Sequence, residues 1–153
     1  MTRIVNIGEA LIDEITRPNS EPVEVVGGSM LNVAAGLTRL GHESELATWF
    51  GRDARGNKVR AHAEAAGVTL TPGSDGADFT TVAHATLDER GRATYEFDLS
   101  WDVPAVEDPD SVGHVHTGSY AVVLEPGADK VLAAVKRQAI RGTVSYDPNI
   151  RPA

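Results

Sequence analysis

The chain has 153 residues, a formal net charge of −8 and no cysteine, and its length accommodates one globular domain. An acidic chain lacks the basic surface that binds nucleic acid, and no apolar run approaches the roughly 20 residues of a membrane-spanning helix. We therefore expect neither nucleic acid nor a membrane as a partner. The absence of cysteine excludes a disulfide scaffold and thiolate catalysis, and it fits a reducing, cytoplasmic location.

Short apolar runs alternate with amphipathic segments along the chain, a pattern typical of parallel α/β domains. Each run ends at turn residues, as a buried strand does at the edge of a sheet. This pattern predicts five core strands, at residues 3–7, 45–50, 68–71, 112–118 and 143–147.

Three helices are predicted between these strands. The first follows Gly27-Gly28, with Ser29 as its N-cap and Gly41 as its stop. The second spans about 54–66 and the third about 128–141. Helical spacing predicts that each helix buries one apolar face. The residues expected on these faces are Met30, Val33, Ala34, Leu37, Leu40, Val59, His62, Ala63, Ala66, Val131, Leu132, Val135 and Ala139.

Two further segments depart from this alternation. Residues 80–87 and 92–99 are rich in strand-forming residues and are joined by Asp-Glu-Arg-Gly, which predicts a hairpin. Residues 14–26 have a similar strand–turn–strand pattern around Pro-Asn-Ser. We expect both segments to form a small antiparallel sheet that projects from a single α/β core.

Polar residues that could bind a ligand follow the predicted strands. Gly27 and Gly28 precede a helix, where the missing Cβ lets a ligand approach the backbone, and Asn32 in the first turn can donate and accept hydrogen bonds. Asp13 follows the first strand, near the sheet edge where open α/β folds bind ligands. A plain tight turn and a solvated turn carboxylate are the structural alternatives for these two segments.

Two more motifs allow both a functional and a structural interpretation. Asp53 stands at a helix start, where capping of the helix is at least as good an explanation as ligand contact. The turn Asp147-Pro-Asn149-Ile-Arg151 places an acid, an amide and a guanidinium after the last strand, and Arg151 suits a phosphate. A proline-stiffened turn is the alternative there. His114 and His116 alternate on one strand, but without a third ligand we expect structural hydrogen bonds and no metal site.

Together these segments resemble the ribokinase-like (PfkB) sugar kinases. Four motifs support this resemblance and occur in the order of that family: Gly-Glu-x-Leu-x-Asp at 8–13, the glycine pair with the downstream Leu-Gly at 27–41, Gly-x-Asp-x-x-Gly at 51–56 and Asp-Pro-Asn-x-Arg at 147–151. The resemblance covers essentially the whole chain, and fructokinase-like members are the most similar. It implies an incomplete three-layer α/β core over residues 1–153, with a β lid formed by about 14–26 and 79–99.

The resemblance also implies roles for individual residues. Asp13, Gly27, Gly28 and Asn32 would contact sugar hydroxyls, and Asn149 with Arg151 would lie near the transferred phosphate. Thr81 and Phe97 of the lid are further candidates for covering the substrate. Asp98 would repel a substrate carboxylate, which favours a neutral, fructose-like sugar over a sugar acid.

One family signature, Asp-Thr-x-Gly-Ala-Gly-Asp, is absent from the sequence. In the family it supplies the anion hole and the general base, and the Asn-x-x-Glu element linked to magnesium is absent too. ATP and Mg²⁺ are therefore implied cofactors whose site is largely missing, no catalytic residue is assigned, and we expect this chain alone to be inactive. The alternatives are a non-catalytic sugar-binding or assembly module and a nucleoside kinase. Unpartnered sheet edges predict a homo-oligomer or pairing with a second chain.

Overall fold

The computed structural model describes residues 3–106 and 111–150. Its core is a five-stranded sheet in the order β5-β4-β1-β8-β9, in which all neighbours are parallel. The strands are β1 (Arg3–Ile7), β4 (Ser44–Ala47), β5 (Thr69–Leu70), β8 (Val112–Gly118) and β9 (Thr143–Asp147). The predictions for β1, β8 and β9 are confirmed to the residue.

The predicted strand at 45–50 is wrong at both ends. It begins one residue earlier and ends at Ala47, because the following backbone turns away to bond a different loop. Thr48 N–H donates to Ser74 Oγ at 3.2 Å and Phe50 N–H donates to the Ser74 carbonyl at 2.9 Å. The strand predicted at 68–71 is reduced to the two residues of β5, because its ends bond elsewhere: Val68 N–H donates to the Ala63 carbonyl at 2.9 Å, and the Thr71 carbonyl accepts from Ser74 N–H at 3.1 Å.

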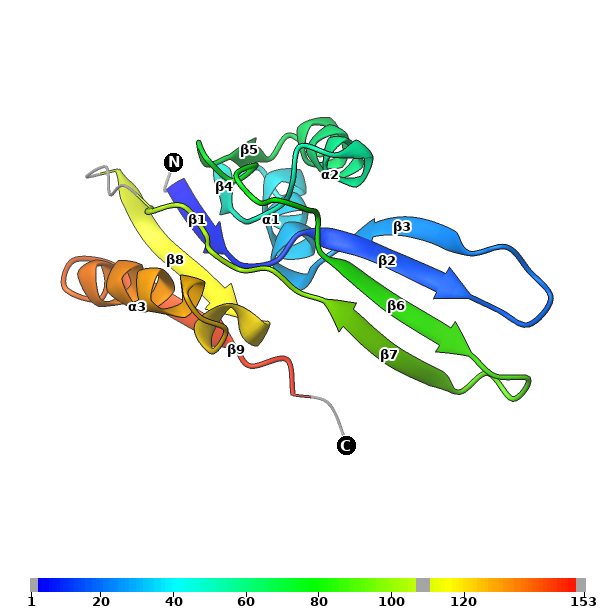
Figure 1. Cartoon of the computed structure of the whole chain (residues 1–153). Coiled ribbons are helices and arrows are strands. Elements are labelled where there is room, and N and C mark those ends of the chain that lie inside the picture. The colour runs from blue at the N-terminus through cyan, green and yellow to red at the C-terminus, as the bar shows by residue number, and fades with distance from the viewer. Residues whose placement is uncertain (1–2, 107–110, 151–153) are drawn as a thin grey trace.

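Helices cover both faces of the central sheet, which gives three layers (Figure 1). On one face lie α1 (Ser29–Arg39) and α2 (Ala54–Ala65), and on the other lie α3 (Gly127–Gln138) and a short 3-10 helix, η1 (Ser119–Val122). The three predicted helices are confirmed, with ends shifted by up to three residues. Among the described residues, no helix has both the length and the apolar character needed to cross a membrane.

Some predicted helix faces are wrong in detail. Leu40 and Leu132 are 77% and 49% exposed, and His62 and Ala139 also face solvent. Leu40 lies at the C-cap of α1, past the last helical residue, where the chain turns toward β4. The buried stripe of α1 instead includes Leu31 and Ala35, because this helix packs against both the sheet and the α2 layer.

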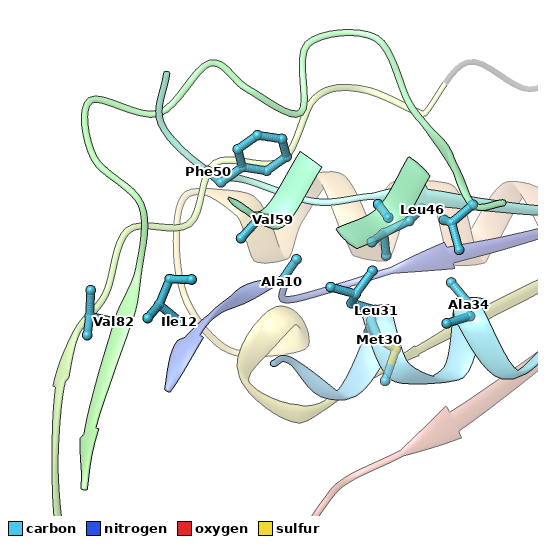
Figure 2. Packing of buried hydrophobic residues seen from close by; sticks show 12 residues of the cluster. Ala10, Ile12, Met30, Leu31, Ala34, Leu46, Phe50, Val59 and Val82 are labelled. Carbon is cyan, nitrogen blue, oxygen red and sulfur yellow. The ribbon is translucent and has the colours of Figure 1, made fainter. Parts of the chain in front are cut away.

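The core between the central sheet, α1 and α2 extends to the second sheet. Leu31 of α1, Leu46 of β4 and Phe50 are essentially inaccessible to solvent and belong to one apolar cluster. Figure 2 shows Ile12 and Val82 side by side at one end of this cluster. These two residues lie in the first two positions of strands of the second sheet, so that sheet is anchored in the core.

The second sheet, here called the projecting sheet, extends away from the core (Figure 1). Its order is β3-β2-β6-β7, formed by β2 (Leu11–Thr16), β3 (Val23–Gly27), β6 (Val82–Leu87) and β7 (Ala93–Asp98). Both hairpins are antiparallel as predicted, but β2 and β6 pair in parallel. The expectation of a purely antiparallel sheet is therefore wrong, because both hairpins leave the core in the same direction.

Ion pairs attach α2 to one face of the projecting sheet. The Arg55 guanidinium lies 2.8 Å from Glu14 Oε2 on β2 and 2.7 Å from Glu24 Oε1 on β3. On the same face the His84 imidazole lies between Glu14, at 2.8 Å, and Asp98, at 3.2 Å. Contacts with α2 thus cover part of this face, and the opposite face is here called the open face.

Candidate functional site

The open face of the projecting sheet carries a carboxylate beside apolar side chains. Strand register aligns Asp13 on β2 with Val25 on β3 and Ala83 on β6, and Ala83 with Phe97 on β7. Directly opposed residues point to the same face of a sheet. Phe97 is 54% exposed and stacks with Tyr95 at 6.3 Å between ring centroids. The result is an exposed aromatic surface next to a carboxylate.

Asp98 does not belong to this face. Register pairs it with Val82, which is buried in the core on the α2 side, and its carboxylate contacts His84 at 3.2 Å. Alternation along β7 turns Asp98 away from Phe97, and the repulsion of an acidic substrate by Asp98 stays a prediction. Asp13 is the carboxylate on the open face.

The glycine pair fits around backbone and carboxylate atoms that leave no room for a side chain. A Cβ on Gly27 would overlap Asp13 Oδ2. A Cβ on Gly28 would lie 2.8 Å from Ala10 Cα and would overlap the Glu9 carbonyl oxygen, and Gly28 has φ 111°. Glycine is the residue that adopts such a conformation at this separation. The pair therefore places the β3–α1 turn directly against the β1–β2 connection, beside Asp13.

The N-terminus of α1 differs from the prediction. Gly28 is the N-cap and makes no side-chain capping bond, whereas Ser29, the predicted cap, is the first helical residue. The Ser29 hydroxyl and N–H both donate to Glu9 Oε1, the N–H at 3.3 Å. Glu9 is only 4% exposed. Sequence reasoning missed its role, because its burial depends on the tertiary approach of two separate turns.

Asn32 and Asn149 lie at the carboxyl-end side of the core. Asn32 is in the first turn of α1 with an exposed side chain, and its N–H donates to the Gly28 carbonyl at 3.1 Å. Asn149 follows β9 with φ 49°, and its N–H donates to Asp147 Oδ1 at 2.9 Å. Parallel strands bring their carboxyl ends to one edge of the sheet, where ligands of α/β folds bind. Arg151 lies outside the described residues.

The predicted residue Thr81 sits beneath this region with its hydroxyl engaged. It is 1% exposed, and its hydroxyl lies 3.4 Å from both the carbonyl oxygen and the nitrogen of Ser100. It also bonds the Tyr120 hydroxyl, while burial and the charge of Glu9 raise the pKa of that phenol. Tyr120 packs edge-on against Trp101 at 5.8 Å. Thr81 and Trp101 are buried and Tyr120 is partly buried, and the sequence carried no signal for Tyr120.

Asp53 serves as the N-cap of α2. Its carboxylate accepts from Gly56 N–H at 2.7 Å, Thr80 N–H at 2.9 Å and the Thr80 hydroxyl at 2.7 Å. The capping interpretation of the Gly-x-Asp-x-x-Gly motif is thus supported. Because Thr80 precedes β6, the same carboxylate ties α2 to the base of the projecting sheet.

This cap predicts acid sensitivity. Burial acts to raise the pKa of the Asp53 carboxyl, but the hydrogen bonds from Gly56, Thr80 and Arg55 outweigh it and hold the pKa below its ordinary value. The stabilisation is therefore present above the unfolded pKa, near 3.9, and is lost as the pH falls through the folded pKa. We expect Asp53→Asn to lower the free energy of unfolding by about 1–2 kcal/mol at pH 7 and by less at pH 3, because the amide nitrogen of Asn cannot accept from Thr80 N–H as Oδ2 does.

Urea denaturation of both proteins at pH 7, 5 and 3 measures this difference. Asp78→Asn is the control, because Asp78 is exposed and lies in the loop between β5 and β6. If the difference in the free energy of unfolding between Asp53→Asn and the parent stays constant down to pH 3, the assignment of the acid-sensitive stabilisation to Asp53 is contradicted.

The paired histidines make structural hydrogen bonds. His114 contacts Thr143 Oγ1 and Ser145 Oγ at 2.7 Å each, and His116 contacts the same Ser145 oxygen at 2.7 Å. Burial lowers the pKa of both imidazoles. Within residues 3–106 and 111–150, no group of three or more His, Asp or Glu side chains is arranged to hold a metal ion.

Comparison with known proteins agrees with this geometry. The pfkB family carbohydrate kinase model matches residues 1–153. The fructokinase of Salmonella typhimurium is 30% identical over an alignment of 154 positions, which covers 95% of this chain and 50% of that protein. The chain spans about half the length of the curated relatives it matches.

Solved structures show the same fold. The apo fructokinase of Vibrio cholerae O395 superposes with a TM-score of 0.82 at 25% identity, over 99% of this chain and 55% of that one. The ATP-bound fructokinase of Xylella fastidiosa gives 0.76 at 22% identity, over 99% and 53%. The incomplete ribokinase-like α/β fold predicted from the sequence is confirmed, and the chain belongs to the pfkB family of carbohydrate kinases.

Proposed function

We propose that this chain supplies the sugar-binding part of an ATP-dependent kinase that phosphorylates a small neutral sugar resembling fructose. The observation that carries the proposal is the fit of Gly27 around Asp13, which fixes a carboxylate at the base of the projecting sheet. The exposed Asn32 side chain stands on the helix that follows the same glycine turn. A carboxylate and an amide are effective partners for vicinal hydroxyl groups.

In this proposal the projecting sheet is the lid, formed by residues of about 14–26 and 79–99. Phe97 would cover the sugar with its apolar face, while Asp13, Gly27, Gly28 and Asn32 contact it. Thr81 would support the site, because its hydroxyl is already engaged. A neutral sugar is favoured by the charge of Asp13 on the open face and by the fructokinases among the relatives.

ATP and Mg²⁺ enter as the cofactors of the complete reaction. A neighbouring fructokinase structure contains ATP, and Asn149 with Arg151 would lie toward the transferred phosphate. Because the Gly-Ala-Gly-Asp motif is absent from the sequence, we propose that this chain alone transfers no phosphate. Its proposed location is the cytoplasm.

Self-association is part of the proposal. Val23, Val25, Tyr95 and Phe97 expose apolar surface on the projecting sheet, and each is about half accessible to solvent. A second copy of the chain would remove this surface from water.

The absent motif also favours a second candidate, a non-catalytic sugar-binding or assembly module. A nucleoside kinase of the same family is the third, since its ribose contacts would be alike. Adenosine binding without fructose binding would favour the nucleoside kinase. Fructose binding combined with no phosphoryl transfer in any complemented form would favour the module.

Calorimetric titration with fructose tests the leading proposal. We expect the parent chain to bind fructose and Asp13→Asn to weaken binding at least tenfold, because a hydrogen bond to a charged acceptor contributes about 1.5–3 kcal/mol. Asp75→Asn is the matched control, since Asp75 is similarly half-buried but pairs with Arg52 and Arg60 beside α2. Equal affinities of the Asp13 and Asp75 variants would exclude Asp13 from the sugar site.

A further inference from the structure

The N-terminus of α1 has no cap within its own segment. Gly28 makes no side-chain bond to the first turn, and that turn contains no acidic residue. The first N–H groups of a helix need acceptors, and the positive end of the helix dipole favours a negative charge. Both requirements have to be met from elsewhere in the chain.

Glu9 meets both requirements from the β1–β2 connection. Its carboxylate oxygen Oε1 accepts from the Ser29 N–H at 3.3 Å and from the Ser29 hydroxyl. Its carbonyl oxygen accepts from the Leu31 N–H at 3.4 Å. One residue therefore supplies acceptors to two N–H groups of the first turn, and its charge lies at the positive end of the helix.

The Glu9 carboxylate is held mainly through this contact. The residue is 4% exposed, and Oε2 is a buried oxygen without a hydrogen-bond partner among the described residues. A buried charge is costly unless fixed dipoles or donors compensate it. Ser29 and the helix end provide that compensation, so the position of the carboxylate and the position of the helix start depend on each other.

The capped turn also lies between proposed sugar contacts. Glu9 precedes Asp13 by a few residues on the path into β2, and its carbonyl oxygen leaves no space for a Cβ on Gly28. Asn32 follows Ser29 in the same helical turn. A shift of the α1 start would therefore move Gly28 and Asn32 relative to Asp13.

We propose that Glu9 is a positioning residue of the sugar site. Acting through Ser29, it fixes the first turn of α1 and with it the separation of Asn32 and Gly28 from Asp13. It does not itself touch the sugar. This inference rests on the proposed sugar-binding function, but the capping itself can be measured without any ligand.

The test combines amide hydrogen exchange with fructose titration on the whole chain. Glu9→Gln keeps the shape and one acceptor but removes the charge, and Ser29→Ala removes the hydroxyl donor. Glu45→Gln is the matched control, because Glu45 on β4 is likewise buried, at 6% exposure, and its carboxylate accepts hydrogen bonds from Arg3 and Thr71. The first turn of α3 serves as the internal reference for exchange.

We expect Glu9→Gln and Ser29→Ala each to speed exchange in the first turn of α1 about tenfold, with no change in α3. Both should weaken fructose binding about tenfold. In the double variant the fold-loss of fructose affinity should be smaller than the product of the two single losses. Glu45→Gln should leave exchange in α1 and fructose affinity unchanged.

The outcomes separate this inference from the proposed function. Unchanged exchange in α1 of Glu9→Gln would overturn the capping. Faster exchange with unaltered fructose affinity would overturn the positioning role while leaving sugar binding intact. If the parent chain binds no fructose, the proposed function fails together with the positioning role, and the exchange rates alone decide whether Glu9 caps α1.

Discussion

Replacement of Gly28 by alanine is expected to lower the free energy of unfolding by about 2–4 kcal/mol and to abolish fructose binding. Two penalties combine at this position. Gly28 has φ 111°, where an L-residue is strained, and its Cβ would lie 2.8 Å from Ala10 Cα and overlap the Glu9 carbonyl oxygen. Neither obstacle is the end of a flexible side chain, so relief requires the β3–α1 turn to move. Urea denaturation and fructose titration measure the two effects.

Two other glycines separate these penalties. Gly41 also has a positive φ, 87°, but a Cβ there would meet nothing within 4 Å, so Gly41→Ala should show the backbone strain alone, about 1 kcal/mol. Gly36 lies in open space inside α1, and Gly36→Ala should stabilise the chain by about 0.5–1 kcal/mol. Similar losses in the Gly28 and Gly41 variants would mean that crowding against Glu9 and Ala10 is unimportant.

The largest effect on stability is expected for Phe50→Ala, about 3–5 kcal/mol. Phe50 is 1% exposed in the cluster that joins α1, α2 and the base of the projecting sheet. The Arg60 guanidinium lies 5.6 Å from its ring centroid, a further contact that alanine removes. Because Ile12 and Val82 belong to the same cluster, the cavity should also loosen the projecting sheet. Thermal and urea unfolding measure the loss, and amide exchange in β2 and β6 measures the loosening.

Phe79→Ala is the control for this substitution. Phe79 is 43% exposed, so its removal costs less transfer free energy and leaves no closed cavity, and we expect a loss of about 1 kcal/mol. A loss for Phe79→Ala equal to that for Phe50→Ala would show that the cluster around Phe50 is not the main core between the two sheets.

Much of the fold was predictable because it depends on local pattern. The strands at residues 3–7, 112–118 and 143–147 are short segments that contain β-branched or aromatic residues and are bounded by turns, and the structure retains them unchanged. The three helices were recognised by spacing and by their flanking glycines. The features that the pattern did not predict are which strands pair in parallel and in which direction side chains point. The parallel contact of β2 with β6 and the orientation of Asp98 toward His84 depend on where each hairpin leaves the core.

The candidate site shows the same difference between features that follow from local sequence and features that depend on tertiary packing. The sequence by itself determined the candidate sugar contacts, namely Asp13, the glycine pair and Asn32, because each belongs to a contiguous motif. Only the tertiary structure decided that Glu9 caps α1 in place of Ser29, since that contact joins turns 20 residues apart. It likewise decided that the Thr81 hydroxyl contacts Tyr120 and Ser100. Burial and long-range hydrogen bonds arise when separate segments pack, and a linear pattern of residue types does not encode which segments meet.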